Sequence, residues 1–189
     1  MKKIVVIGTG QAGASLVIKL RDSGFEGSIT LAGSEAHLPY QRPPLSKKYL
    51  LGEMTLERMY LRPKSYYDDQ KISLELGQTV DQIDRENKVI ILGEKIIPYD
   101  DLVLATGSRP RRLSETIGGN LEKVFTIRDL ADADAMAPEF IEERCVLIIG
   151  GGYIGLEAAA VAATRGLKVT LVEMSDRILS RVAAPQTSD

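Results

Sequence analysis

The sequence predicts an α/β fold with a parallel sheet, because one short pattern occurs twice in the chain. The run Lys3–Gly13 reappears as Val146–Gly155, with three glycines in each copy. These are Gly8, Gly10 and Gly13, and then Gly150, Gly152 and Gly155. In each copy an apolar run typical of a buried parallel strand precedes the glycines, and a helical stretch and a second apolar strand follow them. This order is that of a strand–turn–helix–strand unit.

The elements expected in the two copies are equivalent. They are a strand, a helix and a strand at 3–7, 14–23 and 28–32, and again at 146–149, 156–165 and 168–172. Gly24 and Gly166 follow the two helices, where glycine is typical of a helix C-terminus. The spacing of the copies does not suit a solenoid, so the chain is predicted to hold two versions of one supersecondary unit.

Between the copies, the pattern predicts smaller elements. Residues 38–47 are rich in proline and too apolar for a flexible linker. Short runs that are typical of strands predict a small antiparallel sheet, and they lie at Ile72–Leu76, Val89–Leu92 and 96–97. Further expected elements are a buried strand at 102–105, a surface connection at 108–122 and an exposed helix at 128–142.

Composition excludes several classes of protein. The 189 residues are 44% hydrophobic and 26% charged, a composition typical of a globular protein. The net charge of −2 gives no reason to expect binding to nucleic acid or to a membrane surface. The apolar run after Met1 stops at Gly8, too short for a signal peptide, so we expect a cytoplasmic protein. With Cys145 the single cysteine, no intramolecular disulfide is possible. The sequence shows no cluster of metal ligands.

Each glycine triplet lies between a strand and a helix, which is the context of a dinucleotide-binding turn. The first glycine permits the tight turn, the second lets the backbone approach a pyrophosphate, and the third allows close packing of helix on strand. The helix N-terminus then holds the phosphates. An acidic residue near the end of the second strand should accept the ribose hydroxyls, and Glu35 and Glu173 have about the expected spacing. The alternative for either glutamate is a solvated loop charge.

Three further segments resemble the NADH-dependent ferredoxin reductases that serve cytochrome P450 and aromatic-ring dioxygenase systems. They are Pro39–Lys47 (PYQRPPLSK), Tyr99–Arg111 (YDDLVLATGSRPR) and Gly150–Glu157 (GGGYIGLE), the last with Glu173 after the following strand. The resemblance covers essentially the whole chain in the same order. It implies an FAD/NAD(P)-binding, Rossmann-like fold of the glutathione-reductase type, in which a parallel sheet is accompanied by a small antiparallel sheet.

The resemblance also implies roles for matching residues. Gly8, Gly10, Gly13 and Glu35 would hold the ADP half of FAD. Ala105, Thr106 and Gly107 would pack on FAD, and Val80 would offer its backbone to adenine. Arg42 and Lys47 would lie near the flavin, where Lys47 would pair with Glu157 as the catalytic pair. A cation there stabilises negative charge on a reduced flavin. Gly150, Gly152, Gly155 and Glu173 would bind NADH, with Glu173 disfavouring the 2′-phosphate of NADPH and Arg177 weakening that preference.

The absence of cysteine from residues 40–50 bears on the path of the electrons. Related disulfide reductases carry a pair of cysteines there, and NADH peroxidases and coenzyme-A-disulfide reductases carry a single one. The flavin itself is therefore expected to pass electrons on. The implied activity is hydride transfer from NADH to FAD, followed by single-electron transfer to a [2Fe-2S] ferredoxin. Cys145 is expected to be structural and His37 to be a loop residue. A group of cations either docks the acidic ferredoxin or is simply solvated, namely Arg62, Lys64, Arg109, Arg111 and Arg112.

Family members are about twice as long, so we expect this chain to be a fragment. Residues 1–113 would form the N-terminal part of the FAD-binding domain, and residues 114–189 would begin an NADH-binding domain. This second dinucleotide-binding unit is truncated, since a mononucleotide-binding half needs three strands. Two other functions stay open, a flavoprotein like apoptosis-inducing factor and a catalytically inert dinucleotide-binding module.

Overall fold

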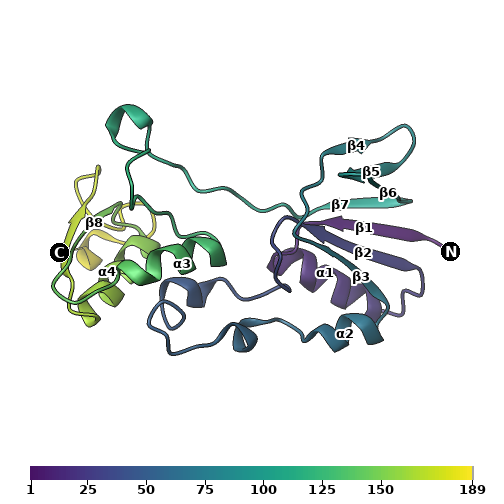
Figure 1. The fold of residues 1–189 in the computed structure, drawn as a ribbon, viewed down its shortest axis with the longest axis horizontal. Coiled ribbons are helices and arrows are strands. Elements are labelled where there is room, and N and C mark those ends of the chain that lie inside the picture. Colours follow the sequence, from purple (N-terminus) through teal and green to yellow (C-terminus); the bar gives the residue numbers. More distant parts are fainter. Residues whose placement is uncertain (189) are drawn as a thin grey trace. The chain divides into compact units, whose positions relative to one another are not determined.

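Four parallel strands form the main sheet in the computed structural model, which describes residues 1–188 (Figure 1). The strands lie in the order β3-β2-β1-β7. Their bounds are Lys3–Ile7 for β1, Ser28–Gly33 for β2, Ile72–Leu76 for β3 and Asp101–Leu104 for β7. In register, Lys3 faces Ser28 across β1 and β2, and Ile4 faces Asp101 across β1 and β7. The predicted parallel sheet is therefore confirmed.

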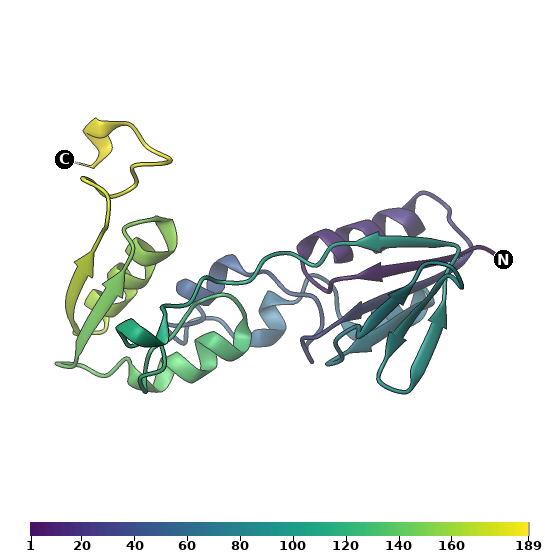
Figure 2. The same cartoon turned by 90° about the horizontal axis from the view of Figure 1, so that it is seen from above.

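The main sheet has a layer on each face, as all-parallel sheets usually do, and β1 and β2 are its most buried strands. The strand at 102–105 was expected to be buried, but Leu104 at the end of β7 is 61% exposed, because β7 lies at the edge of the sheet. Helices α1 (Gln11–Asp22) and α2 (Lys64–Asp69) lie on one face, and a small antiparallel sheet lies on the other (Figures 1 and 2). That sheet consists of β4 (Gln82–Asp84), β5 (Val89–Leu92) and β6 (Lys95–Pro98). Alternate residues of each strand point to opposite faces, so Val6 belongs to the helix-side core and Val5 to the core under the small sheet.

The strand at 72–76 corrects one sequence prediction. Expected in the small antiparallel sheet, β3 instead pairs in parallel with β2, and β4 takes its place beside β5. Apolar alternation predicts a strand but not its partner, and β4 was missed because Ile83 is the one apolar residue in its three.

Residues 1–41 and 57–108 make up this first compact unit, and residues 42–56 join the chain from 109 onward in a second. The second unit contains a two-stranded parallel sheet of β8 (Cys145–Ile149) and β9 (Lys168–Val172). Its helices are α3 (Leu130–Met136) and α4 (Tyr153–Thr164). Short 3-10 helices occur at Pro43–Ser46 (η1), Leu56–Met59 (η2), Glu115–Ile117 (η3), Ala137–Glu139 (η4) and Pro185–Thr187 (η5).

The grouping of residues 42–56 with the second unit differs from the sequential division expected from the sequence. Leu50 is 1% exposed and belongs to the same core as Phe140 and Val161. Tyr49 donates a hydrogen bond from its hydroxyl to Asp134 of α3 at 2.6 Å. These contacts attach the segment to the second unit, while the domain boundary at 113/114 stays a prediction.

The helix expected at 128–142 is shorter and less exposed than predicted. The α-helical part, α3, begins at Leu130 and ends at Met136, and both of these residues are buried. Pro138 then falls in η4, where the missing proline N–H favours a tighter turn over continued α-helix.

The second sheet buries only one face. Val146 and Val169 pack on the core, whereas Leu147, Ile149 and Val172 are 59%, 58% and 45% exposed. The expectation of a fully buried strand at 146–149 is therefore wrong for these residues. Cys145, expected to be structural before a buried strand, is exposed as the first residue of β8. Apolar runs alone do not show whether a second layer is present.

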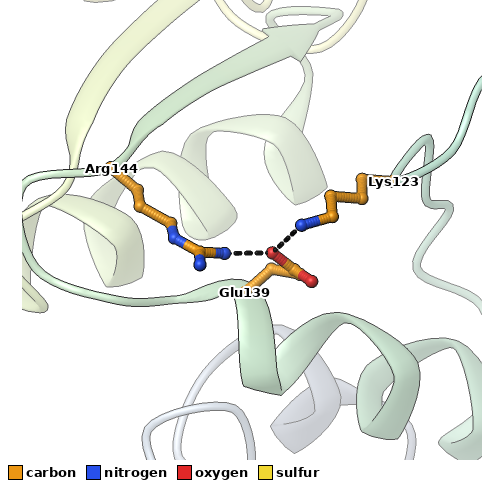
Figure 3. Close-up of polar contacts among 3 residues, drawn as sticks. All are labelled: Lys123, Glu139 and Arg144. Carbon is orange, nitrogen blue, oxygen red and sulfur yellow. Dashed lines mark hydrogen bonds and ion pairs between the residues drawn. The ribbon is translucent and has the colours of Figure 1, made fainter.

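A three-residue ionic network ties the connection before α3 to the segment after it (Figure 3). One carboxylate oxygen of Glu139 accepts from Lys123 at 3.0 Å and also pairs with the guanidinium of Arg144. Hydrogen bonding by Lys123 is the main cause that holds the pKa of Glu139 below its usual value. The network is at the surface, so its contribution to stability is small and falls as the pH drops through the lowered pKa.

Tyr67 of α2 allows a test of the helix-side core. Its side chain is fully buried, and its hydroxyl has no hydrogen-bond partner among residues 1–188. Burial raises the pKa of Tyr67 to about 12. An unsatisfied buried polar group costs about 1–3 kcal/mol, so Tyr67→Phe should raise the free energy of unfolding by about 1 kcal/mol. Tyr67→Ala should lower it by about 3–5 kcal/mol.

Urea denaturation with hydrogen exchange read on β2 and β3 measures both changes. A loss of stability in Tyr67→Phe would show that the hydroxyl is satisfied after all, for instance by an internal water.

Candidate functional site

The turn between β1 and α1 is built by direct backbone contact. Gly8 has φ +122°, and a Cβ added there would lie 2.1 Å from the carbonyl oxygen of Ala105. The amide of Ala105 donates to the carbonyl of Ile7 at 2.7 Å. Residues 105–107, which follow β7, are thereby brought against the first glycine of the turn. The structure thus joins two of the segments that sequence analysis assigned to one cofactor.

The start of α1 is open to a ligand. A Cβ at Gly13 would lie 1.9 Å from the carbonyl oxygen of Gly8, so α1 packs closely on the turn. Gly10 is the N-cap of α1, and no side chain caps the helix. By contrast, Asp129 caps α3 by accepting from the amide of Asp132 at 3.0 Å. The uncapped N–H groups of α1 and its positive dipole end suit the pyrophosphate of a dinucleotide.

The turn between β8 and α4 repeats the geometry of the first turn, except at its first glycine. Gly150 has φ +110°, and a Cβ at Gly155 would lie 2.0 Å from the Gly150 carbonyl oxygen. Gly152 is the N-cap of α4, again with no side-chain cap. A Cβ at Gly150, however, meets nothing within 4 Å. In the first copy that space is occupied by the chain after β7, and in the second no described strand pairs with β8 on that side.

The two acidic candidates have different surroundings. Glu35, in the loop after β2, pairs with the hydroxyl of Tyr40. Glu173, after β9, accepts from the amide of Gly151 at 2.7 Å and from that of Ser175 at 2.8 Å. These backbone hydrogen bonds, led by the one from Ser175, lower the pKa of Glu173 and keep it ionised at neutral pH.

Arg177, the cation near Glu173, is engaged by the end of the chain. Its guanidinium donates to the hydroxyl of Ser188 at 2.8 Å and to the carbonyls of Ala183 and Ser180 at 2.9 and 3.2 Å. A 2′-phosphate would therefore meet the negative charge of Glu173 without a readily available cation at Arg177.

Lys47 and Glu157 form the ion pair that sequence analysis predicted. The two side chains lie 2.6 Å apart, with Lys47 just after η1 and Glu157 on α4. Desolvation by burial acts to raise the pKa of Glu157, but hydrogen bonds from Lys47 and Ser46 outweigh it and the pKa is lowered. Arg42 donates to the carbonyl of Arg128 at 2.8 Å. All these contacts are internal to the second unit.

Ser46 contacts the predicted pair and was not among the residues that sequence analysis named. It is 5% exposed, and its hydroxyl donates to Glu157 at 2.6 Å. Its position next to Lys47 in the PYQRPPLSK segment was the available signal.

The remaining candidates have surroundings that do not test their predicted roles. Val80 is half-buried against the core under the small sheet, and His37 lies in the loop after β2. Lys64 is paired with Asp68, and Arg62 stacks over Tyr66 at 5.4 Å. The exposed Arg109, Arg111 and Arg112 belong to the other unit. Residues 1–188 show no group of three or more potential metal ligands.

Residues 2–189 match the family described as pyridine nucleotide-disulphide oxidoreductase. The chain belongs to this family. It is 46% identical over 186 residues to a ferredoxin–NAD(P)+ reductase of Sphingomonas sp.. It is 43% identical over 188 residues to putidaredoxin reductase of Pseudomonas putida. Each alignment covers 98% of this chain. A crystal structure of a covalent putidaredoxin reductase–putidaredoxin complex matches with a TM-score of 0.93 and 42% identity, over 98% of this chain. The recognition of ferredoxin-reductase relatives from sequence is confirmed.

The chain spans about half the length of the relatives that it matches. It covers 45% of the Sphingomonas reductase, 44% of the Pseudomonas reductase and 45% of the reductase in the complex. The fold class is that of the FAD/NAD(P)-binding reductases, as predicted. No helix among residues 1–188 is long and apolar enough to cross a membrane.

The contact at Gly8 predicts a specific effect on stability. Gly8→Ala places a methyl group against the Ala105 carbonyl and keeps a positive φ, so we expect the free energy of unfolding of the first unit to fall by about 3 kcal/mol or more. Gly24→Ala is the matched control, because Gly24 also has a positive φ but an added Cβ meets nothing within 4 Å. It should cost about 1 kcal/mol.

Urea denaturation followed by hydrogen exchange on β1 and β2 measures both variants. Equal losses for the two would contradict the role given to the contact between Gly8 and Ala105.

Proposed function

We propose that this chain is part of a flavoprotein oxidoreductase that passes electrons from NADH through FAD to a [2Fe-2S] ferredoxin of a cytochrome P450 or aromatic-ring dioxygenase system. The observation that carries the proposal is the backbone cradle of the first unit, in which Gly8, Gly13 and Ala105 meet beside the uncapped start of α1. The names of the relatives support the choice of reaction and of partner.

The residues of the first unit fit FAD. Gly8 and Gly13 let β1, the turn and α1 pack closely, and Gly10 at the N-cap of α1 would let a pyrophosphate approach the backbone N–H groups. Glu35 is placed after β2 to accept ribose hydroxyls. Ala105, Thr106 and Gly107, next to Gly8, would pack on the cofactor, and Val80 would offer its backbone to adenine. When bound, FAD supplies a group that accepts a hydride and releases electrons singly.

The second unit fits NADH in the same way. Gly150, Gly152 and Gly155 would hold its pyrophosphate at the start of α4, and Glu173 would accept hydroxyls of its ribose. Because Glu173 stays ionised at neutral pH, it would repel the 2′-phosphate that distinguishes NADPH.

Lys47 and Glu157 are proposed as the catalytic pair and Arg42 as a further flavin-side residue. Lys47 would place an ammonium where negative charge develops on the flavin, and Glu157 would hold that ammonium in position. The ion pair at 2.6 Å supports the second of these roles directly. The contact of Lys47 and Arg42 with a cofactor held by the first unit stays a prediction.

The acceptor and the location complete the proposal. Among these 189 residues Cys145 is the single cysteine, so no pair of thiols is present in them to hold electrons. A one-electron acceptor such as ferredoxin then suits a flavin that passes its electrons on directly. A cytoplasmic location belongs to the proposal and is tested by cell fractionation.

Spectroscopy with purified protein, at the full length that its gene encodes, tests the function. We expect flavin absorbance bands that NADH bleaches, and cytochrome c reduction that requires added ferredoxin. A colourless protein that ignores NADH would contradict the proposal and favour an inert dinucleotide-binding module. A yellow protein that oxidises NADH but never reduces ferredoxin would favour a role like that of apoptosis-inducing factor.

Glu173→Gln tests the basis of coenzyme choice. The amide keeps an acceptor oxygen for the Gly151 or Ser175 amide but removes the charge, so NADPH should bind about 10-fold more tightly relative to NADH. Titration calorimetry with both coenzymes measures the ratio. Glu143→Gln, which removes the charge of a surface glutamate paired with Lys168, should leave the ratio unchanged. An unchanged ratio in Glu173→Gln would remove Glu173 from the account of specificity.

A further inference from the structure

Ser46 is placed where a hydroxyl has to find a partner within the protein. It is the last residue of η1, and it is 5% exposed beside the fully buried core position of Leu45. Two prolines, Pro43 and Pro44, begin η1 and restrict its backbone, and α4 packs against it. The Ser46 side chain is therefore held by a stiff segment and meets α4 at Glu157.

Two donors converge on a single oxygen of Glu157. The Ser46 hydroxyl and the Lys47 ammonium both lie 2.6 Å from Oε2. Lys47 also donates to the carbonyl of Pro43 at 3.2 Å. The ammonium of Lys47 thus forms an ion pair with the Glu157 carboxylate and a hydrogen bond with the first residue of η1. Both described donors act on Oε2, so the contacts at this oxygen orient the carboxylate.

The two donors differ in how firmly they fix that oxygen. Lys47 is 45% exposed in its side chain and sits on a flexible four-carbon stem, whereas Ser46 has one rotatable bond and is buried. A buried donor to a charged acceptor is stronger than an exposed one, because water does not compete for it. Ser46 is consequently the more rigid of the two supports.

We propose that Ser46 is a positioning residue, which holds the Glu157 carboxylate in the orientation that fixes the Lys47 ammonium. Its meaning for catalysis rests on the function proposed above, but the arrangement itself belongs to this chain. α4 carries no other charged side chain, and Lys47 supplies the charge that acts on Glu157. Ser46, Lys47 and Glu157 all lie in the second unit, so the arrangement is complete within it.

Titration of the Glu157 carboxyl carbon by NMR tests the proposal in the chain itself. Glu157→Gln assigns the signal. Removal of the hydroxyl in Ser46→Ala should move the pKa of Glu157 upward, and Ser46→Thr, which restores a hydroxyl, should bring it back toward that of the unaltered protein. Tyr49→Phe is the control, because Tyr49 lies in the same segment as Ser46 and donates a hydrogen bond from its hydroxyl to Asp134. Removal of that hydroxyl should leave the pKa of Glu157 unchanged.

An unchanged titration in Ser46→Ala, with the amide spectrum of α4 intact, would overturn the proposal and leave Ser46 as a satisfied buried hydroxyl. An equal shift in Tyr49→Phe would also overturn it, because the effect would then come from loosening of the whole segment. If Ser46→Thr is too bulky to fold, the comparison of Ser46→Ala with Tyr49→Phe still decides.

Flavin reduction by NADH in the full-length protein gives a second and separate readout. In Ser46→Ala the acid limb of its pH dependence should move to higher pH, with the KM for NADH changed by less than about 2-fold. A shifted Glu157 titration without any flavin reduction in the unaltered protein would reject the proposed function but keep the positioning role. Flavin reduction in the unaltered protein, with no shift of the Glu157 titration in Ser46→Ala, would support the proposed function and reject the positioning role.

Discussion

The close backbone contact at the first glycine turn is the constraint on which the first unit depends. The Gly8 backbone meets the Ala105 carbonyl, and the Gly8 carbonyl meets Gly13, with no room for a side chain in either place. These two contacts set β7 beside β1 and α1 on top of β1. The sheet order, the helix placement and the open helix start all follow from glycine at these positions.

The sequence predicted most of this arrangement, because its signals are local. Glycine spacing between a strand and a helix determines a turn, and the structure has this turn in both copies. The helix after each turn begins three residues earlier than expected. The Lys47–Glu157 pair was also predicted, but from resemblance, since 110 residues separate the two. What the sequence could not supply was the partner of each strand. Ile72–Leu76 has the same apolar character in either sheet, and only packing on Ile29 and Tyr67 decides between them.

Burial was the other quantity that local patterns misjudged. The apolar runs at 3–7 and 146–149 look alike, yet the first lies between two layers and the second is covered on one face. The same reason explains Cys145, which lies on the uncovered face beside Leu147. Ser46 was missed for the opposite reason: its position beside Lys47 indicates that it lies near the predicted pair, but its burial follows only from the placement of α4.

The interleaving of the two units affects how such a protein can be recombined. The chain passes between them after residues 41, 56 and 108, so each unit is built from two separate stretches. A hybrid that took its second unit from a relative would have to exchange residues 42–56 together with those from 109 onward. Exchange of residues from 109 onward alone would pair Lys47 of one parent with the glutamate of the other, and Leu50 would pack in a core from a different protein. Residues 42–56 thus have to be exchanged together with α4, which η1 contacts, and not with the sheet that precedes them.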